Sequence, residues 1–236
     1  MPINPVFCAI DTNDMERALH LARSLKGTVG GLKLGMEFVY SSCALSVDLI
    51  RGLCEDLPIF LDLKFHDIPN TVAAAVRAVA PLAPYMINVH ASGGRDMMRA
   101  AAEAAASLGP ERPLVVAVTV LTSLDRNDIG EIGVAGTVES QVERLAVLAK
   151  ECGLDGVVCS AREIRAVRRA CGPGFTLVVP GLRPAWAVAN DQKRIETPAE
   201  AKAAGADILV IGRPITAAAD PAAAARRIVD ELAPAT

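Results

Sequence analysis

The stretch Pro58-Ile-Phe-Leu-Asp-Leu-Lys-Phe-His-Asp-Ile-Pro-Asn-Thr71 decides the fold of this chain, because it is typical of an apolar strand running into a helix. Residues two apart in a strand point to the same side, so Asp62 and Lys64 share one face and their apolar neighbours share the other. A buried charge is costly unless it is paired. The two charges therefore predict either a structural ion pair or an acid–base array at the C-terminal end of a strand, where barrel enzymes keep their chemistry.

The alternation of an apolar strand and an amphipathic helix extends from this stretch to both ends of the chain. We expect strands at 6–10, 29–34, 59–65, 85–89, 114–121, 156–159, 175–179 and 208–211. We expect helices at 15–25, 43–54, 70–80, 95–107, 138–152, 161–170 and 221–232, the first of them capped by Thr12 or Asn13. No composition shift or linker divides these units, so they predict one domain over residues 1–236.

Eight strand–helix units at this length predict a single closed (β/α)8 barrel, the TIM barrel, with a doubly wound open sheet as the main rival. The barrel is favoured because polar residues end nearly every strand. A barrel brings all of these ends to one mouth, whereas an open sheet spreads them along a crevice. The polar residues are Asp11, Lys33, Asp62 with Lys64, His90, Thr122, Ser160 and Arg213.

Composition narrows the possible classes of function. The chain is 52% hydrophobic with a net charge of −3 and no basic run, which argues against nucleic acid as a partner. Its apolar runs are strand-length, so no membrane span is expected, and the N-terminus lacks the features of a signal peptide. The six cysteines form no Cys-x-x-Cys pair and the three histidines show no zinc-ligand spacing, so we expect reduced thiols in a cytoplasmic protein without a metal.

Charged residues at three strand ends are the candidates for catalysis. Asp11 could simply cap a helix, but Lys33, in Gly-Gly-Leu-Lys-Leu-Gly, has to point toward something polar. With Asp62, Lys64 and Asp67, it would place two cations and two anions at one mouth. Opposite charges within a few ångströms favour the ionised forms. Such an array can orient a base, stabilise a carbanion or give it a proton.

Two segments near the C-terminus are suited to an anion. Gly212-Arg213-Pro214 follows the last strand, where backbone N–H groups and an arginine can hold phosphate, although a plain turn with a surface arginine is the alternative. The loop at 180–194 is long for a barrel and is typical of a lid, with Arg183 and Gln192 as candidates for gripping an anion. His66 and His90 are expected to be structural.

These residues together resemble the bacterial-type orotidine 5′-phosphate decarboxylase family over nearly the whole chain. The most specific part is Asp62-Leu-Lys64-Phe-His-Asp67-Ile-Pro-Asn-Thr71, which is similar to the family's Asp-x-Lys-x-x-Asp signature with its Ile-Pro-x-Thr tail. The further matches, in the family's order, are Asp11, Lys33, Val120-Leu-Thr-Ser123, Pro180-Gly-Leu-Arg-Pro184, Asp191-Gln192 and Ile211-Gly-Arg-Pro214.

The resemblance implies a lyase of pyrimidine biosynthesis that decarboxylates orotidine 5′-phosphate to UMP, the last step of de novo UMP synthesis. Lys64 would protonate the ring carbon vacated by carbon dioxide, and Asp62 would lie beside the departing carboxylate. Lys33, Asp62, Lys64 and Asp67 would form the charge array. In a homodimer, Asp67 and Thr71 would reach into the neighbouring subunit's site.

The resemblance also implies how the rest of the nucleotide is held, without a metal or organic cofactor. Asp11 and Lys33 would bind ribose hydroxyls, and Thr122 or Ser123 would contact the pyrimidine. The residues implied to hold the phosphate are Arg183, Gln192, Gly212 and Arg213.

Two other functions are weighed against this one. Metal-dependent relatives on the same barrel, 3-keto-gulonate-6-phosphate decarboxylase and hexulose phosphate synthase, share the Asp-x-Lys-x-x-Asp motif. They typically have an acidic magnesium ligand where this chain has Lys33, and a lysine there repels a divalent cation. A non-catalytic sensor of phosphate ligands would be suggested by loss of Lys64 or Asp62, and both are present.

Overall fold

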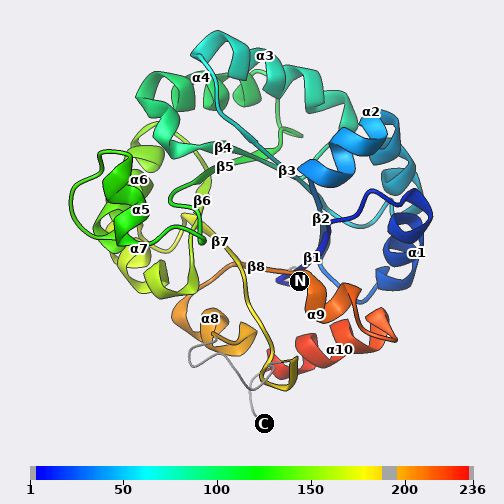
Figure 1. Ribbon diagram of the computed structural model, residues 1–236. Helices are drawn as coiled ribbons and strands as arrows, with labels where there is room; N and C mark the ends of the chain where they lie inside the picture. The colour runs from blue at the N-terminus through cyan, green and yellow to red at the C-terminus, as the bar shows by residue number, and fades with distance from the viewer. Residues whose placement is uncertain (1–3, 188–195, 234–236) are drawn as a thin grey trace.

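The short aliphatic runs form strands that are buried on both faces, as in parallel sheets covered by helices. The computed structural model describes residues 4–187 and 196–233. Each strand pairs in parallel with its neighbours in the sequence and β8 pairs with β1, which closes the barrel (Figure 1). The predicted (β/α)8 barrel is therefore confirmed over the open sheet. The strands are β1 (Val6–Ile10), β2 (Gly31–Gly35), β3 (Ile59–Phe65), β4 (Met86–His90), β5 (Leu114–Val118), β6 (Gly156–Val158), β7 (Thr176–Pro180) and β8 (Ile208–Ile211).

The helices form a ring around the outside of the barrel (Figure 1). The α-helices are α1 (Met15–Leu25), α2 (Met36–Leu53), α3 (Pro69–Val79), α4 (Gly94–Ala106), α5 (Arg126–Glu131), α6 (Val138–Glu151), α7 (Ile164–Cys171), α8 (Pro198–Ala204), α9 (Arg213–Thr216) and α10 (Pro221–Glu231). The described residues also contain the short 3₁₀ turns η1 (Ala80–Leu82), η2 (Ala91–Gly93), η3 (Ala161–Glu163) and η4 (Ala185–Ala187).

Strand alternation divides the buried apolar residues into two clusters. One fills the inside of the barrel and includes Phe60 of β3. The other lies between the barrel and the helices and includes Leu61 and Leu63 of the same strand. Asp62, two residues after Phe60, therefore points into the barrel mouth, as the period of two predicts. The inner cluster consists of Phe7, Ala9, Phe60, Met86, Val116, Val178, Ile208 and Val210.

Several element boundaries differ from those expected. Asp14 caps α1 by accepting a hydrogen bond from the Arg17 N–H, whereas Thr12 supports the cap by accepting one from the Asp14 N–H. The expected capping role of Thr12 or Asn13 was therefore wrong. The helix expected at 43–54 begins at Met36, because Phe38 is fully buried and its packing extends the helix to the end of β2.

Two helices were not expected. α5 lies in the long connection after β5, and Asp125 begins it with a capping box. Thr197 begins α8 in the same way. Both helices are short, so their apolar periodicity is weak, and their capping residues were the stronger signal in the sequence.

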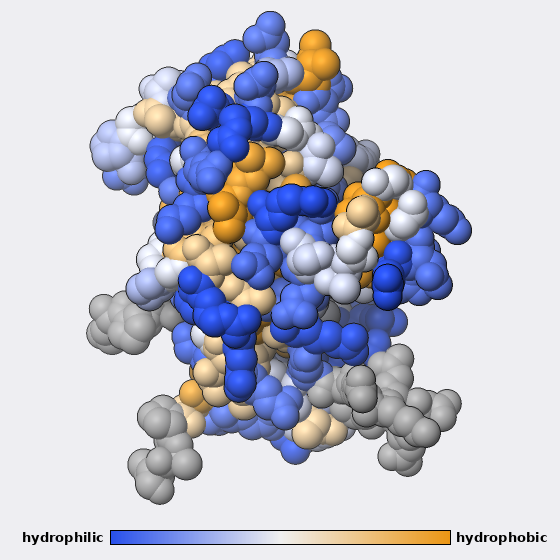
Figure 2. Space-filling view, turned by 90° about the vertical axis from the view of Figure 1, so that its left-hand side faces the viewer, coloured by the Kyte–Doolittle hydropathy of each residue, from blue (hydrophilic) through white to orange (hydrophobic). Residues whose placement is uncertain are grey.

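The outer faces of the helices are mostly polar. Figure 2 shows the side of the molecule that carries α5, α6 and α7, where hydrophobic residues form small patches separated by hydrophilic ones. Such a surface is ordinary for helices packed on a barrel by one face. Within the described residues, no helix is both long enough and apolar enough to cross a bilayer.

Candidate active site

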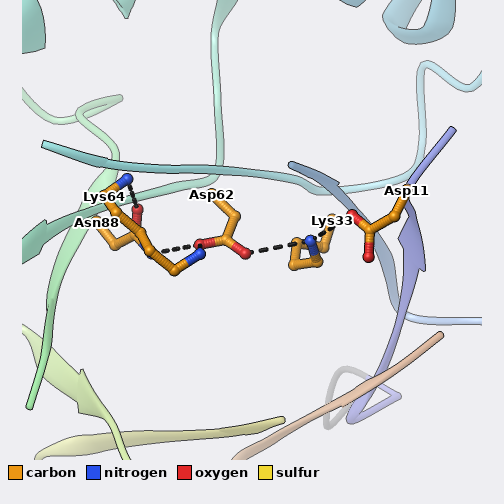
Figure 3. Close-up of polar contacts among 5 residues, drawn as sticks. All are labelled: Asp11, Lys33, Asp62, Lys64 and Asn88. Carbon is orange, nitrogen blue, oxygen red and sulfur yellow. Dashed lines mark hydrogen bonds and ion pairs between the residues drawn. The ribbon is translucent and has the colours of Figure 1, made fainter. Parts of the chain in front are cut away.

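Charged side chains from neighbouring strands meet at the C-terminal mouth of the barrel. Asp11 directly follows β1, Lys33 lies on β2, and Asp62 and Lys64 lie on β3. The Lys33 ammonium lies 2.9 Å from Asp11 Oδ1 and 3.1 Å from Asp62 Oδ2, and Lys64 Nζ lies 2.6 Å from Asp62 Oδ1. The row runs Asp11, Lys33, Asp62, Lys64, so anions and cations alternate (Figure 3). Lys33, Asp62 and Lys64 of the expected array therefore lie together, and Asp11 takes the place in this row that the sequence analysis gave to Asp67.

The carboxylate of Asp62 is the centre of this row. Its side chain is only 12% exposed, yet it has three partners. Oδ2 accepts from Lys33, while Oδ1 accepts from Lys64 and from the side-chain amide of Asn88, at 2.7 Å. A buried carboxylate with this many donors is held in one orientation.

The pairing keeps Asp62 and Lys33 ionised. Burial alone would raise the pKa of Asp62, but the charges of Lys33 and Lys64, with the hydrogen bonds from Lys64 and Asn88, bring that pKa below its usual value. Burial alone would lower the pKa of Lys33, but the charges of Asp62 and Asp11 and hydrogen bonds to both bring it above its usual value. The Asp62 carboxylate and the Lys33 ammonium are therefore both charged near neutral pH.

Lys64 has an unusual backbone for a strand residue. Its φ is +52°, in the left-handed region that residues with a Cβ rarely occupy. The pairing of β3 with β4 shifts register between Leu61 and Phe65, so the chain is irregular at this point. A conformation that costs of order 1–3 kcal/mol persists only where its surroundings impose it, commonly at functional sites.

The sequence analysis did not identify two residues that shape the charged row, Asn88 and Gly35. Asn88 is fully buried on β4, and a polar residue inside an apolar strand was the signal that could have identified it. Gly35 ends β2, and a Cβ there would lie 2.7 Å from Asp11 Oδ1 and 2.9 Å from Lys33 Nζ. A side chain at position 35 would therefore displace the ion pair, which explains the glycine.

A cavity of about 530 Å³ opens above the charged row. Apolar residues such as Phe60 and Val118 line it beside the charged groups, and Glu37, an exposed residue that the sequence did not single out, also contributes. On the far side from β3, the loops after β7 and β8 contribute Arg183, Gly212 and Arg213. The lining residues expected from the sequence are Asp11, Lys33, Asp62, Lys64, Thr122, Arg183, Gly212 and Arg213.

The other expected site residues do not line this cavity in the single chain. Asp67 and Thr71 are exposed, and Asp67 Oδ1 accepts the Ile68 N–H at 2.6 Å. Ser123 lines an adjacent depression rather than the cavity itself. Gln192 lies outside the described residues.

The acidic residue at the centre of the mouth, Asp62, is paired with lysines. In the chain as described, 4–187 and 196–233, no cluster of three or more His, Cys, Asp or Glu has the arrangement for a metal ion. Both oxygens of Asp62 already contact ammonium groups, whose charge repels a divalent cation.

The two histidines near the mouth, His66 and His90, lie with ring centroids 5.3 Å apart. Burial, aided by the charges of His66 and Lys64, lowers the pKa of His90.

Comparison with known proteins shows extensive similarity. A family model described as "Orotidine 5'-phosphate decarboxylase / HUMPS family" matches residues 4–228. The orotidine 5′-phosphate decarboxylases of Rhodospirillum rubrum and Paramagnetospirillum magneticum are 58% and 56% identical, over 98% of this chain and 95% and 99% of theirs. The crystal structure of the Lactobacillus acidophilus orotidine 5′-phosphate decarboxylase aligns with a TM-score of 0.83 at 36% identity, covering 97% of this chain and 99% of that one. The matched range includes all eight strands and every residue named in the cavity.

Proposed function

The chain belongs to the orotidine 5′-phosphate decarboxylase / HUMPS family, and we propose that its cavity holds the nucleotide with the reacting ring carbon against Lys64. The enzyme is a carbon–carbon lyase of pyrimidine biosynthesis that converts orotidine 5′-phosphate into UMP and carbon dioxide. The observation that carries the proposed mechanism is Asp62 held between two ammonium groups inside the barrel mouth.

The chemical step needs a way to accommodate a carbanion. When the carbon–carbon bond to the carboxylate breaks, its electron pair stays on the ring carbon, in the plane of the ring and outside the π-system. The Lys64 ammonium stabilises this charge and then gives the carbon its proton, and Lys64 is reprotonated from water. The Asp62 carboxylate lies beside the departing group and keeps Lys64 in place through the 2.6 Å contact. Asp62 repels the neutral carbon dioxide product less than it repels the negatively charged carboxylate of the substrate.

The remaining polar residues of the cavity bind the parts of the substrate that do not react. Asp11 and Lys33 hold the ribose hydroxyls, and Thr122, which lines the cavity, contacts the pyrimidine. Arg183, Gly212 and Arg213 hold the phosphate, with Gln192 as a further contact from the loop. Binding energy from the phosphate can support the chemical step by fixing the ring against Lys64.

The working unit is a homodimer in which each subunit completes the other's site. Asp67 and Thr71 are exposed and lie outside the cavity of their own chain, and Ile68 between them is 66% exposed. Pro69 begins α3 and fixes its own φ, so this projection is rigid. A two-fold interface would place Asp67 and Thr71 at the partner's mouth.

Two further features of the whole chain follow from the same proposal. The chain acts as one catalytic domain, since the family match and the closed barrel both run over nearly its full length. A cytoplasmic location is inferred from the five cysteines described as buried and free, namely Cys8, Cys54, Cys152, Cys159 and Cys171.

The direct test of the function is to incubate the purified protein with orotidine 5′-phosphate and follow the substrate's ultraviolet absorbance. Loss of absorbance with formation of UMP and carbon dioxide in equal amounts is expected. An inactive protein that still binds the nucleotide would support the alternative of a phosphate-ligand sensor.

Turnover is expected to be unchanged by a chelator. The reason is that ammonium groups contact both oxygens of Asp62, so the carbanion is stabilised by the charge of a lysine and not by a metal ion. The measurement is kcat after extended incubation with EDTA, with and without added magnesium. Activity that disappears with EDTA and returns with magnesium would instead favour the metal-dependent sugar-phosphate enzymes.

Arg213→Ala is expected to weaken the binding of ligands that carry a phosphate and to leave the binding of other ligands nearly unchanged. Losing a charge-assisted contact costs about 1.5–3 kcal/mol, which corresponds to roughly 10- to 150-fold in affinity. The Kd of UMP should rise by this factor, while the Kd of uridine should hardly change. Arg226→Ala removes an exposed arginine from α10 and serves as the control. Equal losses for UMP and uridine would show that Arg213 does not contact the phosphate.

A further inference from the structure

The side-chain amide of Asn88 forms hydrogen bonds with both of the residues proposed to carry out the chemistry, Asp62 and Lys64. Its Nδ2 donates to Asp62 Oδ1 at 2.7 Å, and its Oδ1 accepts the backbone N–H of Lys64 at 2.7 Å (Figure 3). The residue is 0% exposed, so neither contact competes with water. One amide therefore joins the side chain of Asp62 to the backbone of Lys64.

The register between β3 and β4 explains why a side chain is needed here. Leu61 pairs with Ile87 and Phe65 pairs with Val89, so residues 62–64 of β3 lie opposite Asn88 alone. A bulge of this size removes regular ladder bonds and leaves backbone groups to be satisfied in another way. The Lys64 N–H, in a residue with φ +52°, finds its acceptor in the Asn88 side chain.

We propose that Asn88 is a positioning residue that holds the bulge of β3 in shape and so fixes the Asp62 carboxylate relative to the Lys64 ammonium. This inference rests on the proposed function, because it concerns the geometry in which Lys64 meets the substrate. An inner strand position does not itself require asparagine, since Met86, two residues earlier on the same strand, fills the barrel interior with an apolar side chain. The polar side chain at position 88 is needed instead to hydrogen-bond the irregular segment of β3.

Two substitutions separate the two hydrogen bonds. Asn88→Leu has a similar volume and removes both, and it should lower kcat by at least about 100-fold, because a misplacement of about 1 Å at the reacting groups costs about that much. KM should stay within about threefold, since the groups proposed to hold phosphate lie in the loops after β7 and β8. Asn88→Asp keeps an acceptor for the Lys64 N–H and loses the donor to Asp62.

The aspartate variant has a pH signature that a purely structural role would not produce. Two carboxyl groups at hydrogen-bond distance cannot both ionise easily. The pair therefore shares one proton, which it loses only at a pH above the usual pKa of a carboxyl group. With that proton, the introduced carboxyl group could donate to Asp62 as the asparagine amide does. The kcat of Asn88→Asp relative to wild type should therefore rise as the pH is lowered through the raised pKa of this pair, whereas the ratio for Asn88→Leu should be independent of pH.

The groups that face the pair are common to all variants. They are Lys33 from β2, Lys64 from β3, Asp11 beyond Lys33, and His90, whose pKa responds to the charge of Asp62. Measuring each variant against wild type at the same pH removes their own titration from the ratio. Thr119→Val is the matched control, because it removes a buried side-chain hydrogen bond that goes only to the Val158 carbonyl. Its kcat and pH profile should match wild type.

Hydrogen exchange at the Lys64 amide tests the contact independently of turnover. The amide should be protected in wild type and in Asn88→Asp, and should lose protection in Asn88→Leu, with global unfolding followed in parallel. Failure of the wild type to turn over orotidine 5′-phosphate would overturn the proposed function, while the exchange result would still decide whether Asn88 holds the bulge. An active wild type with variant kcat values within threefold, or a pH-independent ratio for Asn88→Asp, would overturn the positioning role.

Discussion

Replacing Lys64 with alanine is expected to lower kcat by about 10²–10⁴-fold while leaving the barrel folded, which is the range for losing a positioned general acid. The ammonium of Lys64 lies 2.6 Å from Asp62 at the cavity wall, where the ring carbon is proposed to lie. Lys33 does not offer a ready substitute, because Asp11 and Asp62 both hold its ammonium. The loss should appear in kcat more than in KM, since Lys64 acts on a charge that exists only in the transition state.

Alanine is the appropriate replacement because it removes the side chain that carries the ammonium and leaves the backbone at position 64 unchanged. It keeps a Cβ in the left-handed conformation at position 64, whereas glycine would also release the backbone strain. It also keeps the backbone N–H that Asn88 accepts. Thermal unfolding and single-turnover kinetics of Lys64→Ala should be compared with those of Lys150→Ala, which removes an exposed lysine from α6. A Lys64→Ala enzyme that keeps more than about a hundredth of wild-type kcat would rule out Lys64 as the proton donor.

Mixing Asp67→Ala and Lys64→Ala proteins, each nearly inactive alone, is expected to restore activity. In a mixed dimer, one site would combine the intact Lys64 of one chain with the intact Asp67 of the other. The second site would carry both defects. Turnover should therefore approach about half of wild type per mixed dimer, provided that subunits exchange. The physical reason is that Asp67 is exposed and lies outside the cavity of its own chain.

A matched pair of variants controls for non-specific recovery. Asp62 and Lys64 contact each other within one chain, so mixing Asp62→Ala with Lys64→Ala should restore nothing, because every site would keep one defect. Formation of mixed dimers can be shown by mass spectrometry with one subunit isotopically labelled. Mixed dimers of Asp67→Ala and Lys64→Ala that stay inactive would place Asp67 in the site of its own subunit.

The sequence was most informative where function depends on neighbours along the chain. The period of two placed Asp62 and Lys64 on one face of β3, and both line the cavity. The helical turn after β8 was expected from Gly212-Arg213-Pro214 and is present as α9. Helix starts were predicted less well, as α2 shows, because a helix can be extended by a single buried residue such as Phe38.

The missed residues show what local patterns leave out. Gly35 matters because Asp11 and Lys33, 22 residues apart, form an ion pair across the space that a Cβ would fill. Asn88 matters because it reaches Asp62, 26 residues away, on the neighbouring strand. Neither distance can be read from a propensity or a period, since each depends on which strands pair and in what register.

The sequence by itself determined the eight strand–helix units, the closed barrel, and the charged residues that end the strands, because hydrophobic periodicity and side-chain alternation are properties of neighbouring residues. Only the tertiary structure decided how those charges are held. The pairing of β2 with both β1 and β3 places Lys33 between two carboxylates, and the shifted register of β3 against β4 gives Lys64 its left-handed backbone and its contact with Asn88. These features exist only when strands distant in the chain lie side by side, since a hydrogen bond or ion pair requires its atoms within about 3–4 Å.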